Sequence, residues 1–161
     1  ACAKSRHAQE IQVILAGKGP LEKKYRKLAE KLPNPIVMSF YEPARLLDIL
    51  HMADLYVHTS DAEIEAMSCM EAFACGLVPV IADSPRSATP QFALDERSLF
   101  PAGDTDALAA RIDWWIEHPE ERREMERRYA EHARQYSLEA SIRKTEEMFR
   151  QAIAEQRGAR A

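Results

Sequence analysis

The sequence predicts an α/β fold in which a doubly wound, Rossmann-like parallel sheet carries helices on both faces. Three observations predict it. Short apolar runs alternate along the chain with segments whose apolar residues recur at helical spacing. The first run, IQVILAG, is apolar apart from Gln12 and ends on a glycine, as a buried strand can. The length of 161 residues suits one hydrophobic core, so we expect a single domain over residues 1–161.

The expected strands are five short apolar runs. The first, IQVILAG, ends at a glycine that can serve as a turn. Pro79 lies at the beginning of the fourth run, the one place in a strand that suits it, because proline cannot donate a ladder hydrogen bond. In chain order the runs cover residues 11–17, 35–40, 54–60, 78–84 and 98–104.

Helices are expected between and after these strands. Pro119 suits the first turn of a charged helix, whose residues 117–134 read as a solvated face with i,i+4 ion pairs. The helix before it presents one apolar face, and the last helix covers about residues 137–156. The apolar positions of these two helices are Leu108, Ile112, Trp115 and Ile116, and then Leu138, Ile142, Phe149 and Ile153.

The opening segment, ACAKSRHAQE, reads as the end of a helix that leads into the first strand. A doubly wound domain normally has a strand before such a helix. We therefore expect the chain to be part of a longer protein, with its first strand encoded before Ala1.

Composition excludes several classes of function. A net charge of −4, without a basic stripe, argues against nucleic-acid binding. No apolar run reaches the roughly 18–20 residues of a membrane span, and the opening is too polar for a signal peptide. Cys2, Cys69 and Cys75 form no disulfide framework, which favours a reduced, cytoplasmic setting. The five histidines show no metal-ligand spacing, so no metal site is expected.

The stretch SDAEIEAMSCMEAFACG carries the chemistry. A helix starting near Glu65, just after a strand, would present free N–H groups and a positive dipole end to an anion. Glu63 would precede this helix and Glu71 would lie about two turns inside it. Eight helical residues span about 12 Å.

That separation suits a sugar nucleotide, which has hydroxyl-rich groups at both ends and phosphates between them. Carboxylates accept paired hydrogen bonds from adjacent hydroxyls. Glu63 and Glu71 could each hold one end. From spacing alone, a solvated helix face that happens to carry acids is the favoured interpretation.

This segment resembles the E-x7-E signature of the retaining, GT-B-fold glycosyltransferases of family 4, group 1. Glu63 and Glu71 occupy its two positions, and EAFACGLVPVIA is similar to the run that follows. VILAGKGPLEKKYRKLA, LLDILHMADLYVHTS and DTDALAARIDWWIEHPEERREM extend the likeness over about residues 11–135. The sequence of residues 60–96, from SDAEIEAM to FALDE, is similar to the sequences of a bacterial subgroup that includes diacylglycerol glucosyltransferases.

The resemblance implies a role for each site residue. Glu63 would be the catalytic residue beside the reacting carbon of the hexose, and Glu71 would bind the ribose hydroxyls. The other implied donor-binding residues are Ile64, Glu65, Ala66 and Met67 near the hexose and diphosphate, Phe40 and Tyr41 at the nucleobase, and Gly17 and Gly19 at the edge of the cleft.

Two segments depart from the family pattern. Many members read E-G-F-G where this chain has Glu63, Ile64, Glu65 and Ala66, and the usual G-G-x-x-E loop is replaced by SPRSATPQF. Family members also place an Arg and a Lys against the diphosphate, from the loop after the first strand of the domain. We expect this loop and the acceptor-binding N-terminal domain to lie outside residues 1–161, which would leave the isolated chain inactive.

The resemblance therefore implies the C-terminal, donor-binding half of a retaining hexosyltransferase. The expected donor is UDP-glucose or a similar sugar nucleotide, and no metal or other cofactor is expected. The acceptor would be a lipid or a saccharide held by the N-terminal domain, on a cytoplasmic enzyme that could associate with the inner membrane face. The alternatives are a non-catalytic nucleotide or sugar-phosphate binding module, a sugar-nucleotide epimerase and a phosphorylase.

Overall fold

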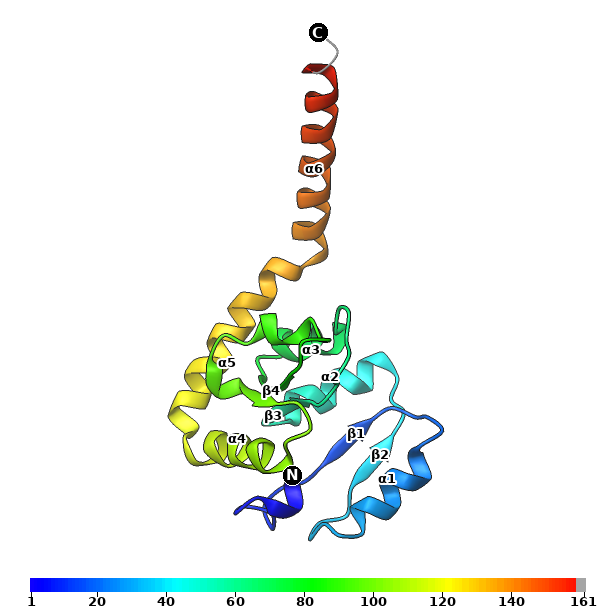
Figure 1. The fold of residues 1–161 in the computed structure, drawn as a ribbon, viewed down its shortest axis with the longest axis vertical. Helices are drawn as coiled ribbons and strands as arrows, with labels where there is room; N and C mark the ends of the chain where they lie inside the picture. Colours follow the sequence, from blue (N-terminus) through cyan, green and yellow to red (C-terminus); the bar gives the residue numbers. More distant parts are fainter. Residues whose placement is uncertain (159–161) are drawn as a thin grey trace.

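The structure, a computed structural model, describes residues 1–158 and has the predicted α/β architecture of parallel strands flanked by helices (Figure 1). Each strand lies inside a predicted apolar run, shortened at one or both ends. The strands are β1 (Ile14–Ala16), β2 (Val37–Ser39), β3 (Leu55–His58), β4 (Val78–Asp83) and β5 (Leu99–Pro101).

The described helices follow the predicted order. Pro119 is the first residue of its helix, as expected, and the opening segment forms a short 3-10 turn, Cys2–Lys4, rather than the end of an α-helix. The α-helices are α1 (Glu22–Ala29), α2 (Pro43–Met52), α3 (Met67–Ala74), α4 (Thr105–Glu117), α5 (Pro119–Ala133) and α6 (Leu138–Gly158). No helix among residues 1–158 is long and apolar enough to cross a membrane.

The strands form two parallel sheets rather than one continuous sheet. β1 pairs with β2, with Ile14 opposite Val37, and the second sheet has the order β3-β4-β5. No described strand is hydrogen-bonded between β1 and β3. The two sheets therefore each have an open edge, at β1 and at β3.

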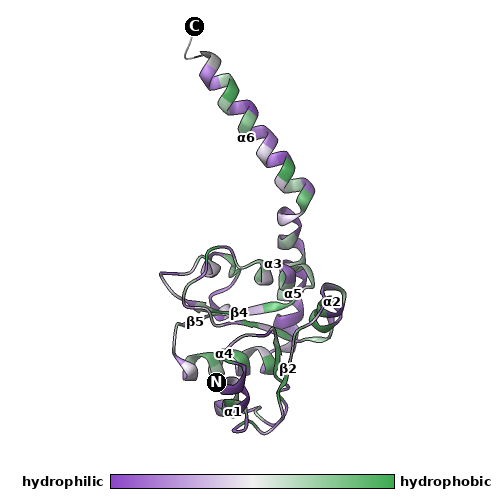
Figure 2. Ribbon diagram, turned by 90° about the vertical axis from the view of Figure 1, so that its right-hand side faces the viewer, coloured by the Kyte–Doolittle hydropathy of each residue, from purple (hydrophilic) through white to green (hydrophobic). Residues whose placement is uncertain are grey.

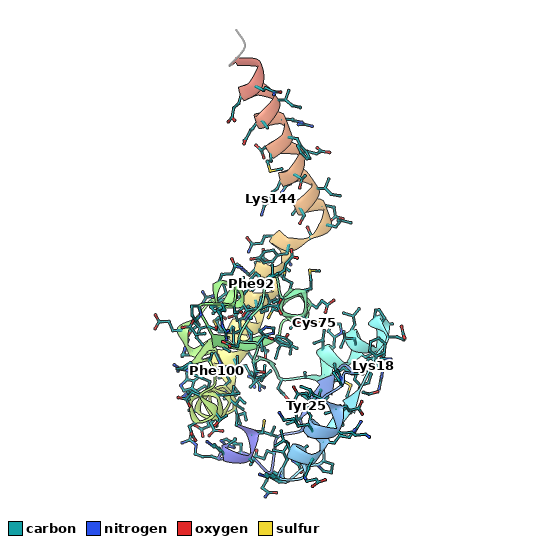
Figure 3. All side chains as sticks on the ribbon, turned by 45° about the vertical axis from the view of Figure 1, so that its right-hand side comes forward. Lys18, Tyr25, Cys75, Phe92, Phe100 and Lys144 are labelled. Atoms are coloured by element: carbon teal, nitrogen blue, oxygen red, sulfur yellow. The ribbon has the colours of Figure 1, made fainter. Side chains whose placement is uncertain are left out.

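The hydrophobic core surrounds β4. Five of its six residues are buried, as expected for the central strand of a parallel sheet covered on both faces. Phe73 of α3, Trp115 of α4 and Tyr129 of α5 are fully buried against it. Leu108 and Ile112 are buried beside Trp115, which confirms the predicted apolar face of α4. In Figure 3, Phe92 and Phe100 lie within this body.

The outer helix α6 extends away from the body, and its sides alternate in hydropathy (Figure 2). Its predicted apolar positions are all exposed, with Leu138 at 74% and Phe149 at 58%. The sequence pattern correctly gives an amphipathic helix, but among the described residues nothing covers its apolar side.

The segment before β1 is anchored on α4, beside the N-terminus in Figure 1. The buried carboxylate of Asp113 accepts a hydrogen bond from the Ser5 hydroxyl and another, of 3.1 Å, from the Arg6 backbone N–H. Burial alone would raise the pKa of Asp113, but these donors outweigh it and hold the pKa below its usual value. Asp113 is therefore ionised at neutral pH and fixes this segment to the helix.

We predict that Asp113→Asn lowers the free energy of unfolding by about 1–2 kcal/mol at pH 7, because charge-assisted hydrogen bonds are lost. The pKa of Asp113 is lower in the folded chain than in the unfolded chain. Its contribution is therefore complete above the unfolded value of about 3.9 and is lost as pH falls through the folded pKa. Denaturant unfolding at pH 7 and below pH 4 measures the difference.

Asp106→Asn is the matched control, because Asp106 pairs with Lys4 at a side chain that is 79% exposed. An exposed pair of this kind contributes less than about 1 kcal/mol. Equal effects of the two variants at pH 7 would contradict the anchoring role of Asp113.

Candidate functional site

The loops after β3 and β4 are hydrogen-bonded to each other. The Glu63 N–H donates to the Arg86 carbonyl at 3.3 Å, and the Ala88 N–H donates to the Glu63 carbonyl at 2.9 Å. This isolated parallel bridge pairs Glu63 with Ser87. Both loops lie at the carboxyl ends of neighbouring strands, where ligands bind in folds of this type.

A polar cluster reinforces this junction. The Ser84 hydroxyl donates to the Asp61 carbonyl oxygen at 2.7 Å and to its carboxylate at 2.8 Å, and Arg86 forms an ion pair with the same carboxylate. This cluster was not predicted from the sequence. A signal was present, since Asp61 directly follows one predicted strand and Ser84 is the last residue of the next.

The carboxylate of Glu63 is held by its own loop. The Ile64 N–H donates to it at 2.9 Å. This hydrogen bond, with weaker contributions from the Glu65 and Ala66 N–H groups, keeps the pKa of Glu63 below its usual value. The half-buried Glu63 is therefore an ionised acceptor at neutral pH.

The helix after this loop starts later than predicted. α3 begins at Met67 rather than near Glu65, because Ala66 adopts the left-handed conformation, with φ 51° and ψ 56°. Glu71 consequently lies about one turn inside the helix rather than two, a rise of about 6 Å from its first residue. Its side chain is exposed, so the carboxylate is open to a ligand.

The residues between the two glutamates form an open rim. Ile64 is 92% exposed and Met67 is 60% exposed, and Glu65 is exposed as well. Ala66 is the buried member, at 5%. The Cys69 N–H donates to the Ala66 carbonyl at 2.8 Å, whereas the Met67 and Ser68 N–H groups before it have no partner within the helix, which gives this rim the hydrogen-bonding character of an anion site.

A hydroxyl–imidazole chain lies behind the start of α3. The Tyr56 hydroxyl donates to the Ser68 hydroxyl at 2.8 Å and lies 3.1 Å from His58 Nδ1. Burial lowers the pKa of His58, which keeps the ring neutral at neutral pH, although the charge of Glu63 opposes the shift. The alternation of a strand explains why Tyr56 and His58 share one face, and this network ties β3 to α3.

A second group of predicted residues gathers at the ends of β1 and β2. The Gly17 N–H donates to the Ser39 carbonyl at 2.8 Å, and Lys18 Nζ lies 5.6 Å from the centre of the Phe40 ring, which is 59% exposed. In Figure 3, Lys18 lies at the outer side of the molecule. Tyr41, the next residue, is half-buried.

The two predicted glycines differ. Gly17 has φ 148°, a conformation that favours glycine, whereas Gly19 has no positive φ; a Cβ at either position would meet nothing within 4 Å. The structure thus brings Gly17, Gly19 and Phe40 together at one sheet and Glu63 to Glu71 at the other. Among residues 1–158, no hydrogen bond or ion pair joins the two groups.

Residues 1–158 contain no cluster of three or more His, Cys, Asp or Glu side chains that could hold a metal ion. The two cysteines near α3 are free thiols, and burial raises the pKa of Cys69 to about 11. Cys69 is therefore a core thiol that stays protonated at neutral pH.

The comparisons decide the family. The sequence model described as "Glycosyl transferases group 1" matches residues 1–135. The chain belongs to the group 1 glycosyltransferases. The catalytic domain of cholesterol-alpha-glucosyltransferase from Helicobacter pylori is 48% identical, with a TM-score of 0.81 over 84% of this chain and 86% of that chain. No curated protein matches.

The chain is thus a C-terminal GT-B domain of a glycosyltransferase, as the E-x7-E resemblance implied. This assignment favours glycosyl transfer over the epimerase, the phosphorylase and the non-catalytic module. The glycosyltransferase match ends at residue 135, so α6 lies wholly outside it.

The conformation of Ala66 gives a test of the loop geometry, because a left-handed residue tolerates glycine and penalises β-branched side chains. We predict that Ala66→Val costs about 2 kcal/mol or more, whereas Ala66→Gly stays within about 1 kcal/mol of the parent, since strain relief offsets the lost methyl burial. Ala110, exposed within α4, is the control.

At Ala110 the order should reverse, because valine has a higher helix propensity than glycine. Urea unfolding of the valine and glycine variants at Ala66 and Ala110 measures the order of their free energies of unfolding at each position. If valine were tolerated better than glycine at both positions, Ala66 would not hold the left-handed turn in solution.

Proposed function

We propose that this domain binds the nucleotide-sugar donor of a retaining hexosyltransferase, with UDP-glucose or a close relative as the donor. Glu71 holds the ribose hydroxyls of the nucleotide. The ionised Glu63 carboxylate accepts hydrogen bonds from the hexose beside the reacting carbon. The diphosphate faces the start of α3.

One observation carries this proposal. Two glutamates flank a helix start at the carboxyl ends of β3 and β4, with Glu63 half-buried and ionised and Glu71 exposed one turn into α3. This arrangement matches a ligand whose anionic centre lies between two hydroxyl-bearing groups. It also explains why polar side chains persist in such an apolar segment.

The proposal of glucose as the transferred sugar is supported by the name of the Helicobacter pylori relative. The Helicobacter pylori protein is by name an alpha-glucosyltransferase, which supports glucose as the hexose and an α-linked product here. Transfer from an α-linked donor with retained configuration would give that linkage. Proton NMR of the product's anomeric centre tests retention, and a β-linked product would exclude it.

Catalysis in this proposal depends on electrostatic stabilisation of the departing diphosphate and on placement of the two substrates. Arg86 is already paired with Asp61, and Glu63, Glu65 and Glu71 add negative charge around α3. The positive charge for the diphosphate then comes from a segment outside residues 1–161. Residues 1–161 alone would bind UDP weakly, as calorimetry can measure, without transferring sugar.

The acceptor is proposed to be a lipid or a saccharide held by an N-terminal domain. The relative acts by name on cholesterol, which supports a lipid. An enzyme with such an acceptor would work at the inner membrane face. Transfer assays with a sterol, diacylglycerol and free saccharides distinguish the two acceptor classes.

We predict that substitutions of the two glutamates affect different kinetic constants of the full-length enzyme. Glu71→Ala should raise the KM for the donor about 10-fold or more, because it removes paired hydrogen bonds made in both ground and transition states. Glu63→Ala should lower kcat about 100-fold or more with a smaller change in KM, because its contact strengthens as charge develops. Initial rates at varied donor concentration measure both.

Glu124→Ala is the control, because Glu124 is an exposed residue of α5 that pairs with its neighbour Arg127. It should leave both constants unchanged. Wild-type kinetics in the two site variants would contradict the assignment of the donor site.

A further inference from the structure

The pairing of β3 with β4 changes register by one residue before it reaches the candidate site. In the ladder between these strands, His58 lies opposite Ile81. In the isolated bridge beyond the ladder, Glu63 pairs with Ser87. Between these two pairs the chain after β4 therefore uses one residue more than the chain after β3.

Asp61 and Ser84 lie where the ladder register still holds. Continued along both chains, that register places Asp61 opposite Ser84. A side chain makes the contact here, because the Ser84 hydroxyl donates to the Asp61 carbonyl oxygen at 2.7 Å and to the Asp61 carboxylate at 2.8 Å. The same hydroxyl accepts from the Arg86 N–H at 3.3 Å. Ser84 thus holds both its opposite residue and the nearby backbone of its own loop.

The buried hydroxyl makes the stronger part of this contact. Ser84 is 2% exposed, so its hydrogen bonds are shielded from water. The ion pair between Arg86 and Asp61 joins side chains that are 68% and 55% exposed, and a pair so open to solvent adds little to stability. The pair does keep the Asp61 carboxylate turned toward the loop after β4. Together these contacts hold the two loops in one register.

The register decides which way the side chains of the two loops point. Side chains alternate between the faces of a paired strand, and a slip of one residue turns them to the opposite face. Paired with Ser87, Glu63 has a carboxylate that accepts from the Ile64 N–H at 2.9 Å. If the ladder register continued unchanged, Glu63 would lie opposite Arg86 instead, and one of the two loops would have its side chains turned over.

We propose that Ser84 and Asp61 are positioning residues for glycosyl transfer, which fix the position of the Glu63 carboxylate by fixing the register of its bridge. The inference rests on the proposed role of Glu63 beside the reacting carbon. A misplacement of about 1 Å can lower an enzymatic rate about 100-fold, so a change of register at Glu63 would slow the chemical step. Ser84 and Asp61 act through Glu63 and are not themselves catalytic residues.

Kinetics of the full-length enzyme test this role in two backgrounds. In the parent, Ser84→Ala and Asp61→Asn should each lower kcat about 10-fold and change the donor KM less than about 2-fold, because the transition state depends on the placement of Glu63. In the Glu63→Ala background, the same substitutions should lower kcat less than about 2-fold further, because no carboxylate is left to position. Ser98→Ala is the matched control and should leave kcat unchanged, since Ser98 is a fully buried serine directly before β5, at the opposite end of the sheet.

Three kinetic results would overturn the proposal. The first is an unchanged kcat in both loop variants. The second is an equal loss of kcat in the two backgrounds, which a general structural defect would produce. The third is a raised donor KM at constant kcat, which direct contact with the donor would produce. Wild-type kinetics of Glu63→Ala alone would contradict the proposed function instead, so the two failures are distinguishable.

A crystal structure of the full-length Ser84→Ala enzyme tests the register separately from the chemistry. The hydrogen bond from the Ala88 N–H to the Glu63 carbonyl, 2.9 Å here, is expected to be lost or moved to a neighbouring residue. The same bond at its present length, with Glu63 still opposite Ser87, would overturn the proposal whatever Glu63 does in catalysis. Asp61→Asn preserves the shape of the side chain and provides the same measurement if Ser84→Ala does not fold.

Discussion

The candidate site depends on a backbone bridge, in which the main chain of Glu63 is held on both sides by the loop after β4. This bridge prolongs the parallel pairing of β3 and β4 beyond the ends of the strands. It fixes the position from which the chain turns through the left-handed Ala66 into α3. Without this bridge, Glu63 and Glu71 would be separated by a fixed number of residues along the chain but would not be held at fixed positions in space. With it, the two carboxylates flank the helix start in a set geometry.

The strands and helices could largely be predicted, because apolar runs and helical spacing report directly on burial. Trp115 and its neighbours on α4 are buried as their spacing indicated. The start of α3 could not be predicted, because nothing in alanine itself signals a left-handed conformation. The exposure of Leu138 and Phe149 was equally hidden, since an amphipathic pattern shows that a face needs a partner but not whether one is present.

The same contrast holds for the site. Glu63 and the glycine turn lie at the carboxyl ends of strands, as expected, whereas Glu71 lies one turn inside α3 rather than two. The pairing of Arg86 with Asp61 was not predictable from spacing, since the residues lie in different loops that only the fold brings together. The open edges of β1 and β3 concern hydrogen bonds between segments, which no local pattern reports. The departure from the family's E-G-F-G run acquires a physical meaning: Ala66 takes a conformation that glycine adopts without strain.

The central claim is that Glu63 and Glu71 hold the two ends of a sugar nucleotide across the start of α3. A crystal structure of the full-length enzyme with UDP-glucose or an unreactive analogue tests it most directly. The account predicts ribose hydroxyls within hydrogen-bond distance of the Glu71 carboxylate, about 2.6–2.9 Å, with the hexose beside Glu63 and the diphosphate at the first turn of α3. A nucleotide bound elsewhere, or bound here with Glu71 turned to solvent, would contradict it.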